Sequence, residues 1–192
     1  MKIAILVAVR EEFNPNNTEL RTDDKVFYTG VGKINAAAAT QKAIDVFAPD
    51  LILNFGTAGS AKFNYGTIVN PTGFVQRDMN PTEFLAPKYI TPLSSDTDPV
   101  LKYGTRVPDY PECITGTGDS FVNNIAGEIW DIVGMEDYAV AHVARDNKIP
   151  FACLRFISDG ADSNAPEQWE RVLDSANIAL IEAYKKICKF VR

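Results

Sequence analysis

The stretch Phe151-Ala152-Cys153-Leu154-Arg155-Phe156-Ile157, followed directly by Ser158-Asp159-Gly160, decides the fold class of this chain. Its apolar residues run almost without interruption, a pattern typical of a strand that is covered on both faces. An acidic residue, Asp159, comes just after this strand. Ligands of open α/β sheets bind in the crevice beyond the carboxyl ends of the strands, so the sequence predicts a functional site at that edge.

Strands and helices alternate along the rest of the chain. We expect strands at Ile3–Val9, Val26–Tyr28, Leu51–Phe55, Thr67–Asn70, Gly73–Arg77, Cys113–Thr117 and Ile132–Val133 and helices at Ile34–Phe47, Glu136–Asp146 and about Pro166–Phe190. With 192 residues and 46% hydrophobic content, the chain can bury one sizeable core. The sequence therefore predicts a single α/β domain over residues 1–192, with a mixed twisted β-sheet flanked by helices.

The region Asn80–Pro111 breaks this alternation. It is rich in Pro, Ser, Thr and Asp and has few periodic apolar positions. Long segments of this kind inside a compact domain are usually functional, so we interpret it as a functional loop or a partly mobile lid.

Composition limits the possible partners and the compartment. The net charge of −6 argues against a nucleic-acid binder, which needs a basic face. No apolar run is long enough to span a membrane, and Ile3–Val9 is too short for a secretory signal. Three scattered cysteines, Cys113, Cys153 and Cys188, predict free thiols in a reducing compartment. We therefore expect a cytoplasmic protein.

Two glycine turns could present backbone N–H groups to an oxygen-rich ligand. Gly30-x-Gly32 precedes a helix, and Gly56-x-x-Gly59 follows a strand. Neither forms a complete dinucleotide fingerprint, and no phosphate-binding GxxxxGK[ST] motif occurs. Taken alone, each is better interpreted as an ordinary tight turn, because glycine commonly marks turns.

Carboxylates at strand and helix ends are the stronger chemical signal. Glu11 and Glu12 follow the first strand, Glu136 opens a helix, and Asp159 follows a strand. Each alone could cap a turn or favour a helix dipole. Together at one sheet edge they suit acid-assisted cleavage at a sugar carbon. The only histidine, His142, falls in mid-helix and predicts a packing or solvent-edge role, which excludes histidine-dependent triads and histidine-rich metal sites.

Several blocks, in order from end to end, resemble the nucleoside phosphorylase superfamily. They are Met1-Lys2-Ile3 through Glu11-Glu12, Gly30-Val31-Gly32-Lys33-Ile34-Asn35-Ala36-Ala37, Asn54-Phe55-Gly56-Thr57-Ala58-Gly59, Gly118-Asp119-Ser120-Phe121-Val122, Met135-Glu136, Ala139-Val140-Ala141-His142-Val143 and Arg155-Phe156-Ile157-Ser158-Asp159. The chain is most similar to the branch of 5′-methylthioadenosine/S-adenosylhomocysteine nucleosidases. This resemblance implies a nucleoside phosphorylase-like fold and hydrolysis of the N-glycosidic bond of a 5′-substituted adenosine.

The resemblance implies three catalytic residues. Asp159 would protonate or hydrogen-bond purine N7, Glu136 would accept hydrogen bonds from the ribose hydroxyls, and Glu12 would activate the attacking water. The implied substrate-binding residues surround them. Ser158 would orient Asp159, Arg155 would position the water, and Met135 would pack on the sugar. The base would contact Phe121 and main-chain groups of Val122. The resemblance also places Ala58, Gly59 and, in the apolar 5′ pocket, Val9, Val31, Phe84 and Trp169 among the binding residues.

The same resemblance leaves three alternatives open. Phosphorylase branches place an Arg where this chain has Asn54, and a phosphate dianion needs fixed cationic partners, so water is the favoured acceptor. A purine nucleoside phosphorylase and a non-catalytic nucleoside-binding or storage protein are the alternatives. Gly134 replaces an acidic residue that often precedes Met-Glu, so another purine nucleoside or a futalosine-like substrate is possible. The resemblance implies no metal or organic cofactor and a homodimer or higher homo-oligomer whose neighbour completes the 5′ pocket.

Overall fold

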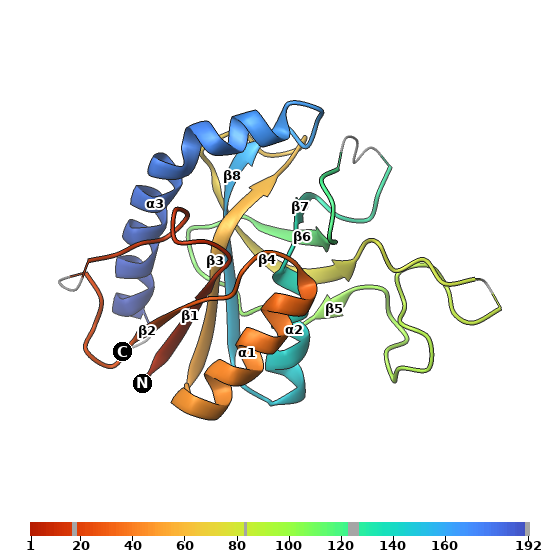
Figure 1. Ribbon diagram of the computed structural model, residues 1–192, viewed down its shortest axis with the longest axis horizontal. Helices are drawn as coiled ribbons and strands as arrows, with labels where there is room; N and C mark the ends of the chain where they lie inside the picture. The colour runs from red at the N-terminus through yellow and green to blue at the C-terminus, as the bar shows by residue number, and fades with distance from the viewer. Residues whose placement is uncertain (17–18, 83, 123–126, 191–192) are drawn as a thin grey trace.

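A mixed β-sheet with helices on both faces forms the body of the protein (Figure 1). The computed structural model describes residues 1–16, 19–82, 84–122 and 127–190. The strands are β1 (Ile3–Val7), β2 (Lys25–Tyr28), β3 (Leu51–Gly59), β4 (Ile68–Gln76), β5 (Leu101–Lys102), β6 (Glu112–Thr117), β7 (Ile132–Gly134) and β8 (Phe151–Asp159). The helices are α1 (Lys33–Phe47), α2 (Asp137–Asp146) and α3 (Ala165–Phe190). The predicted fold class, a mixed twisted sheet flanked by helices, is confirmed.

Strand β8 is the centre of the sheet. It pairs in parallel with β3 along its length and antiparallel with the start of β4. On one side β3 continues the sheet to β1 and β2, both parallel. On the other side β4, β6 and β7 follow in parallel order, and β7 meets β3 again through the pair Gly59 and Val133. The strands β3, β8, β4, β6 and β7 thus close into a ring, which brings the carboxyl ends of β3, β7 and β8 together.

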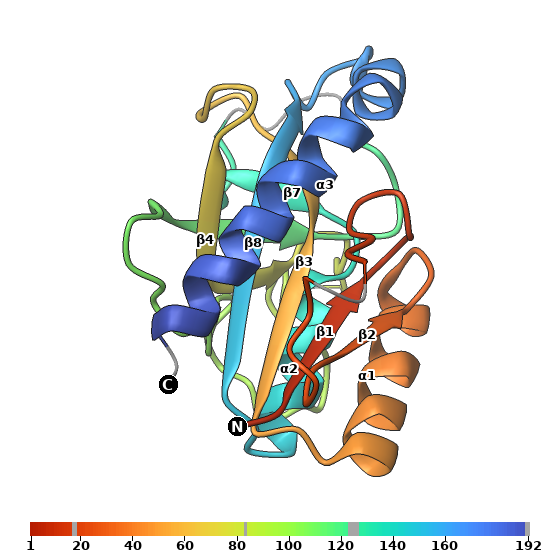
Figure 2. The same cartoon turned by 90° about the vertical axis from the view of Figure 1, so that its left-hand side faces the viewer.

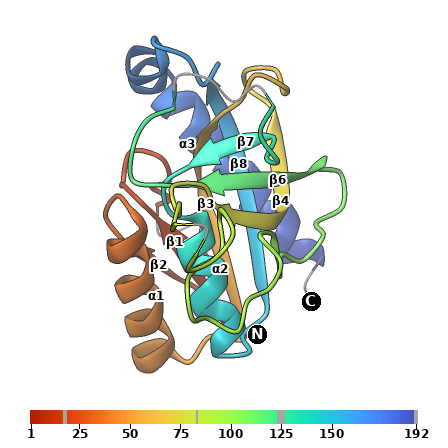
Figure 3. The ribbon, with the colours of Figure 1, turned by 90° about the vertical axis from the view of Figure 1, so that its right-hand side faces the viewer.

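Alternate residues of the central strands pack in two separate hydrophobic cores. Ile5, Leu53 and Leu154 belong to a core that includes Leu180 and Tyr184 of α3. Their sequence neighbours Leu6, Ile52 and Cys153 belong to a second core with Ala36 of α1 and Val140 of α2. Successive side chains of a strand point to opposite faces, so both faces must be covered. Figures 2 and 3 show α3 on one face and α1 with α2 on the other.

Strand β4 differs from the prediction of two strands separated by Pro71. It is one strand from Ile68 to Gln76, and its register with β6 shifts between Pro71 and Gly73. The ring nitrogen of Pro71 cannot donate to the ladder, so the irregularity falls where a hydrogen bond is missing. The chain nevertheless stays extended, because β8 pairs with the first part of β4 and β6 with the second. The prediction of a break at Pro71 is wrong.

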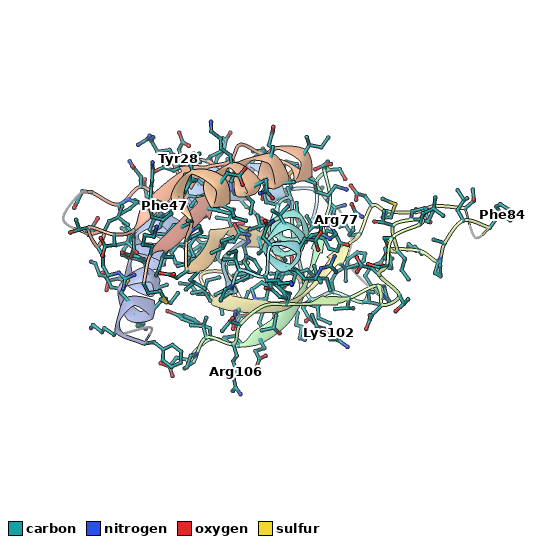
Figure 4. All side chains as sticks on the ribbon, turned by 90° about the horizontal axis from the view of Figure 1, so that it is seen from below. Tyr28, Phe47, Arg77, Phe84, Lys102 and Arg106 are labelled. Atoms are coloured by element: carbon teal, nitrogen blue, oxygen red, sulfur yellow. The ribbon has the colours of Figure 1, made fainter. Side chains whose placement is uncertain are left out.

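The region predicted as a loop, Asn80–Pro111, is mostly irregular but contains the short strand β5, which pairs antiparallel with β4. It projects from the body of the molecule, and Phe84 lies at its far end (Figure 4). Several contacts anchor it: Tyr89 packs edge-on against Trp130, and Arg145 of α2 forms an ion pair with Asp96. The hydroxyl of Tyr103 also donates to the carbonyl oxygen of Ile149. Whether the region acts as a lid stays a prediction. Among the described residues, no helix is both long enough and apolar enough to cross a membrane.

Candidate active site

One cavity of about 270 Å³ lies at the carboxyl ends of β1, β3, β7 and β8. It is the place predicted from the acidic residues at strand ends. All predicted site residues except Phe84 and Arg155 line it, namely Val9, Glu12, Val31, Ala58, Gly59, Phe121, Val122, Met135, Glu136, Ser158, Asp159 and Trp169. The three carboxylates therefore converge on one space, although they come from distant parts of the chain.

Glu12 lies in the turn after β1 and is only 5% exposed. Its two carboxylate oxygens have different surroundings. Oε1 accepts hydrogen bonds from the backbone N–H of Thr57 at 3.0 Å and from its hydroxyl at 2.6 Å. Oε2 is buried and has no hydrogen-bond partner among the described residues. One oxygen thus fixes the side chain, and the other is available to accept a proton.

The hydroxyl of Thr57 connects Glu12 to helix α3. It accepts a hydrogen bond from Nε1 of Trp169 at 2.9 Å and donates its own proton to Glu12. Trp169 therefore has a polar contact in addition to its predicted place in an apolar wall. Thr57 was part of a recognised motif, but its link to Glu12 was not predicted, because it depends on how β3 and the β1 turn meet in space.

Glu136 precedes α2 and is 7% exposed. Its Oε1 accepts a hydrogen bond from the backbone N–H of Gly32 at 2.9 Å. Gly32 has φ of +92°, a conformation that glycine adopts without strain, so the turn can aim its N–H at the carboxylate. Burial raises the pKa of Glu136 to about 7, while the charge of Arg155 opposes that rise.

Asp159 is the last residue of β8. Its Oδ1 accepts a hydrogen bond from the backbone N–H of Ala161 at 2.9 Å, and its Oδ2 accepts one from the hydroxyl of Ser158 at 2.7 Å. A side chain at Gly59 would collide with this carboxyl group. The closing of the β3–β7–β8 edge therefore depends on a glycine beside Asp159. The predicted role of Ser158 in orienting Asp159 stays a prediction, and the hydrogen bond between them is compatible with it.

The wall opposite Asp159 includes Phe121, whose side chain is 58% exposed. The segment before it is held by Arg77, which lies just after β4. Arg77 donates hydrogen bonds to the carbonyl oxygens of Gly118, at 3.1 Å, and of Ser120. Sequence reasoning placed Arg77 at the end of a strand but missed this contact. Arg77 is the only cationic side chain that lines the cavity among the described residues, and its guanidinium is used by main-chain oxygens.

Arg155 does not line the cavity. It is fully buried in β8 behind the cavity wall, and its guanidinium pairs with the carboxylate of Asp137. Its predicted contact with an attacking water would thus be made from behind the cavity wall, beside Gly56. A Cβ atom placed on Gly56 would collide with Arg155 and would lie 3.3 Å from Oε2 of Glu12, so both groups are close to this glycine. Sequence reasoning missed Asp137. A signal was present, because Asp137 shares the buried face of α2 with Val140, Ala141 and Ala144 at helical spacing.

Phe84 lies outside the cavity and is 94% exposed. The prediction that it lines the 5′ pocket is wrong for a single protomer. The backbone N–H of Tyr89 donates to the carbonyl of Met79 at 2.8 Å, which closes the segment between them into an outward loop with Phe84 on it (Figure 4). The side chain of Phe84 thus lies in solvent.

Other candidate chemistry lies elsewhere or is absent from the described residues. His142 stacks on Tyr138 at the surface of α2 and is 3.3 Å from Asp146, in keeping with a solvent-edge role. Across the described part of the chain, no group of three or more His, Cys, Asp or Glu residues is arranged to hold a metal ion.

A closed strand ring with three carboxylates around one apolar cavity defines an α/β protein that binds a small organic ligand at its strand ends. Residues 24–192 match the phosphorylase superfamily, and the chain belongs to that family. It is 29% identical to a 5′-methylthioadenosine/S-adenosylhomocysteine nucleosidase of Exiguobacterium sp. strain AT1b, over 93% of both chains. The corresponding enzyme of Buchnera aphidicola is 28% identical, over 98% of this chain and 97% of its own.

Solved structures share the fold. The nucleosidase of Helicobacter pylori bound to butyl-thio-DADMe-Immucillin-A superposes with a TM-score of 0.86 at 23% identity, over 98% of both chains. Native futalosine hydrolase of the same organism gives 0.85 at 22% identity, over 98% of this chain and 97% of that one. At these identities the likeness establishes the fold, and it extends over almost the whole molecule.

Proposed function

We propose that this protein is a purine nucleoside N-glycosidase. It hydrolyses the N-glycosidic bond of a 5′-substituted adenosine, of the 5′-methylthioadenosine or S-adenosylhomocysteine type, to free base and the ribose product. The observation that carries the proposal is the convergence of Glu12, Glu136 and Asp159 on one cavity, with one oxygen of Glu12 unpartnered among the described residues. The curated relatives that match most of the chain carry nucleosidase names.

The chemistry divides between the three carboxyl groups. As the bond from C1′ to N9 breaks, positive charge develops on the ribose and the bonding electrons move to the purine. Asp159 donates a proton to N7 and makes the base a better leaving group. Glu136 holds the ribose hydroxyls and stabilises the positive charge. A water molecule attacks C1′ and gives its proton to Oε2 of Glu12. General acid–base assistance of this kind is worth roughly 10²–10⁴-fold in rate.

Water is favoured over phosphate because most of the nearby cationic and amide donors are already engaged. The guanidinium of Arg155 binds Asp137, and the amide of Asn54 donates to the same carboxylate at 3.1 Å. Arg77 donates to main-chain oxygens through Nη2, which leaves its buried Nε as the one guanidinium nitrogen without a partner among the described residues. A phosphate dianion requires free charge-assisted donors, and the unpartnered Oε2 of Glu12 would repel it.

The end of the cavity near Trp169 suits an apolar 5′ substituent. Val9, Val31 and Met135 line the cavity together with the Trp169 ring. These side chains bind a thioether group better than a charged one, because burying a charge without a partner is costly. They support a methylthio group or the thioether part of a longer substituent.

We further propose that the protein works as a homo-oligomer in a reducing cytosol. Phe84, Leu85 and Leu93 expose large apolar side chains on the same projecting region, and their exposed fractions are 94%, 55% and 101%. Exposed apolar groups gathered on one region are typical of an interaction surface. Free cysteines at positions 113, 153 and 188 agree with a reducing compartment.

The decisive experiment is a panel of purine nucleosides incubated with the protein, with and without phosphate. Free base and the reducing sugar are separated by chromatography. We expect adenine release from 5′-methylthioadenosine without phosphate, and loss of this release in Asp159→Asn. Phosphate-dependent formation of a ribose 1-phosphate would instead identify a phosphorylase. A nucleoside that binds but stays intact after long incubation would identify a binding protein.

A further inference from the structure

We propose that Asp137 is a positioning residue for this hydrolysis, fixing the guanidinium of Arg155 behind Gly56 so that its charge acts on Glu12 and Glu136. The inference rests on the proposed nucleosidase function and deepens it. Asp137 does not line the cavity, so any effect it has on the reaction must pass through the residues that it holds.

Asp137 is the most heavily bonded carboxylate near the site. Its side chain is fully buried. Oδ1 accepts hydrogen bonds from Nε of Arg155 at 2.6 Å, from its Nη2, and from Nδ2 of Asn54 at 3.1 Å. Oδ2 accepts the hydroxyl proton of Thr115 at 2.8 Å. These donors come from β3, β6 and β8, so the carboxylate ties three strands to the start of α2. A buried charge that makes all its hydrogen bonds holds its partner in one position.

Arg155 is held where its charge reaches the catalytic carboxylates. A built Cβ on Gly56 would collide with Nη1 of Arg155 and would lie 3.3 Å from Oε2 of Glu12. The guanidinium and the unpartnered oxygen of Glu12 therefore meet at the same glycine. Burial opposes the charge on Arg155, but Asp137, together with Cys153 and Glu136, outweighs this effect and keeps the pKa of the guanidinium above its ordinary value. Arg155 is a permanent cation at this point.

Gly134 makes room for this arrangement. A Cβ at position 134 would lie 2.6 Å from Oδ2 of Asp137, too close for real atoms. The sequence marked Gly134 as a departure from a pattern with an acidic residue before Met-Glu. In the structure, an acidic group occupies the adjacent space but comes from Asp137, the residue directly after Glu136. The carboxylate of Asp137 can occupy this space because residue 134 has no side chain.

The charge of Asp137 also influences Glu136. The groups that face Glu136 are Arg155 from β8, Glu12 from the turn after β1, Asp137 from α2 and the N–H of Gly32 before α1. Burial is the main cause of its raised pKa; Arg155 lowers that pKa, whereas Glu12 and Asp137 raise it. Asp137→Asn removes the charge but keeps an amide oxygen that accepts hydrogen bonds from Arg155, so Arg155 still faces Glu136 and we expect the pKa of Glu136 to fall.

The first test compares wild type with Asp137→Asn, using 5′-methylthioadenosine as the probe. We expect kcat to fall by about 10²-fold with KM almost unchanged, because a small misplacement of catalytic groups has this cost. The acid limb of the kcat/KM profile should also move to lower pH. Thr115→Val is the matched control: it removes a neutral donor to the same carboxylate and should leave the acid limb in place. An unmoved acid limb in Asp137→Asn, or an equal move in both variants, overturns the inference.

The second test covers the case in which Asp137→Asn fails to fold because it leaves a buried arginine uncompensated. The double variant Asp137→Asn with Arg155→Gln removes both charges. We expect it to fold, to bind 5′-methylthioadenosine and to turn over about 10²-fold more slowly than wild type. If the single variants fold, the double variant and Arg155→Gln should differ in kcat by less than about twofold. Asp137 acts through Arg155, so its loss has little further effect once Arg155 is replaced. If the double variant turns over at the wild-type rate, the inference about Asp137 is wrong but the proposed function stands. Absence of base release by wild type overturns the proposed function and the inference with it.

Discussion

At the residue scale, the two oxygens of Glu12 allow a sharp test of its role as a base. Glu12→Gln keeps the shape and the contact with Thr57 but provides no carboxylate oxygen to take a proton. We expect turnover to fall by about 10²–10⁴-fold with little change in KM. Initial rates of adenine release measure it. Glu11→Gln is the matched control, because Glu11 is exposed and adjacent in sequence. Equal losses in the two variants would contradict the assignment.

The contact between Trp169 and Thr57 provides a second test. Trp169→Phe keeps an aromatic ring in the cavity wall but removes the N–H that binds the hydroxyl of Thr57 at 2.9 Å. We expect kcat to fall about tenfold, because the variant loses one hydrogen bond to the hydroxyl that orients Glu12. KM should stay close to that of wild type. Trp169→Ala, which also removes the ring, should raise KM. If Trp169→Phe changes only KM, the tryptophan serves the 5′ pocket alone.

The raised pKa of Glu136 predicts the pH dependence of the reaction. Its carboxylate form stabilises positive charge on the ribose, and burial raises its pKa to about 7. Below that pH the group gains a proton and loses its charge, so kcat/KM should decrease as pH falls from 8 to about 6. Glu136→Gln should be slower at every pH and should lack this acid limb. The same limb in Glu136→Gln would assign it to another group.

At the scale of elements, the junction of β3 with β8 tests how closely the strand ends must approach. A Cβ at Gly59 would collide with the carboxyl group of Asp159 and lie 3.2 Å from Cα of Ala161. We expect Gly59→Ala to displace Asp159 and lower kcat by about 10²-fold, while the core of the sheet stays folded. Circular dichroism checks the fold and base release checks the rate. Gly66→Ala is the control: no atom lies within 4 Å of the added Cβ, so its only cost is backbone strain at φ of +80°, and it should lower stability without lowering kcat.

The strands that are covered on both faces could be predicted from the sequence, because their apolar runs depend on local composition. Strand β8 and the helices α1 and α3 lie close to their predicted positions. The closing of the sheet into a ring could not be predicted. It depends on the single pair of Gly59 and Val133, and no local pattern specifies such a distant partner. The continuity of β4 through Pro71 was missed for the same reason, since its partners β6 and β8 maintain it.

The part of the site that could be predicted from the sequence is the set of residues that the order of strands places at strand ends. Glu12, Glu136 and Asp159 met in one cavity because the carboxyl ends of β1, β3, β7 and β8 meet there. The residues that hold them could not be placed this way. Thr57 and Asp137 act through contacts between side chains of different elements, which a single sequence does not encode locally. Asp137 nevertheless had a readable signal, a charged residue at an apolar helical position.

At the scale of the whole molecule, the projecting region around Phe84 predicts an assembly. Phe84 is exposed at the far end of this region and does not line the cavity of its own protomer (Figure 4). In a homodimer its side chain could cover the 5′ end of the neighbour's cavity, as the resemblance implies. We expect light scattering to give about twice the mass of one chain. Phe84→Asp should dissociate the dimer and raise KM for 5′-methylthioadenosine more than for adenosine, because only the former has an apolar 5′ group to cover.

Ile178→Asp, at an exposed apolar position on α3, is the control and should change neither the mass nor KM. A monomeric wild type with full activity would contradict the assembly, and a dimeric Phe84→Asp with unchanged KM would exclude Phe84 from it.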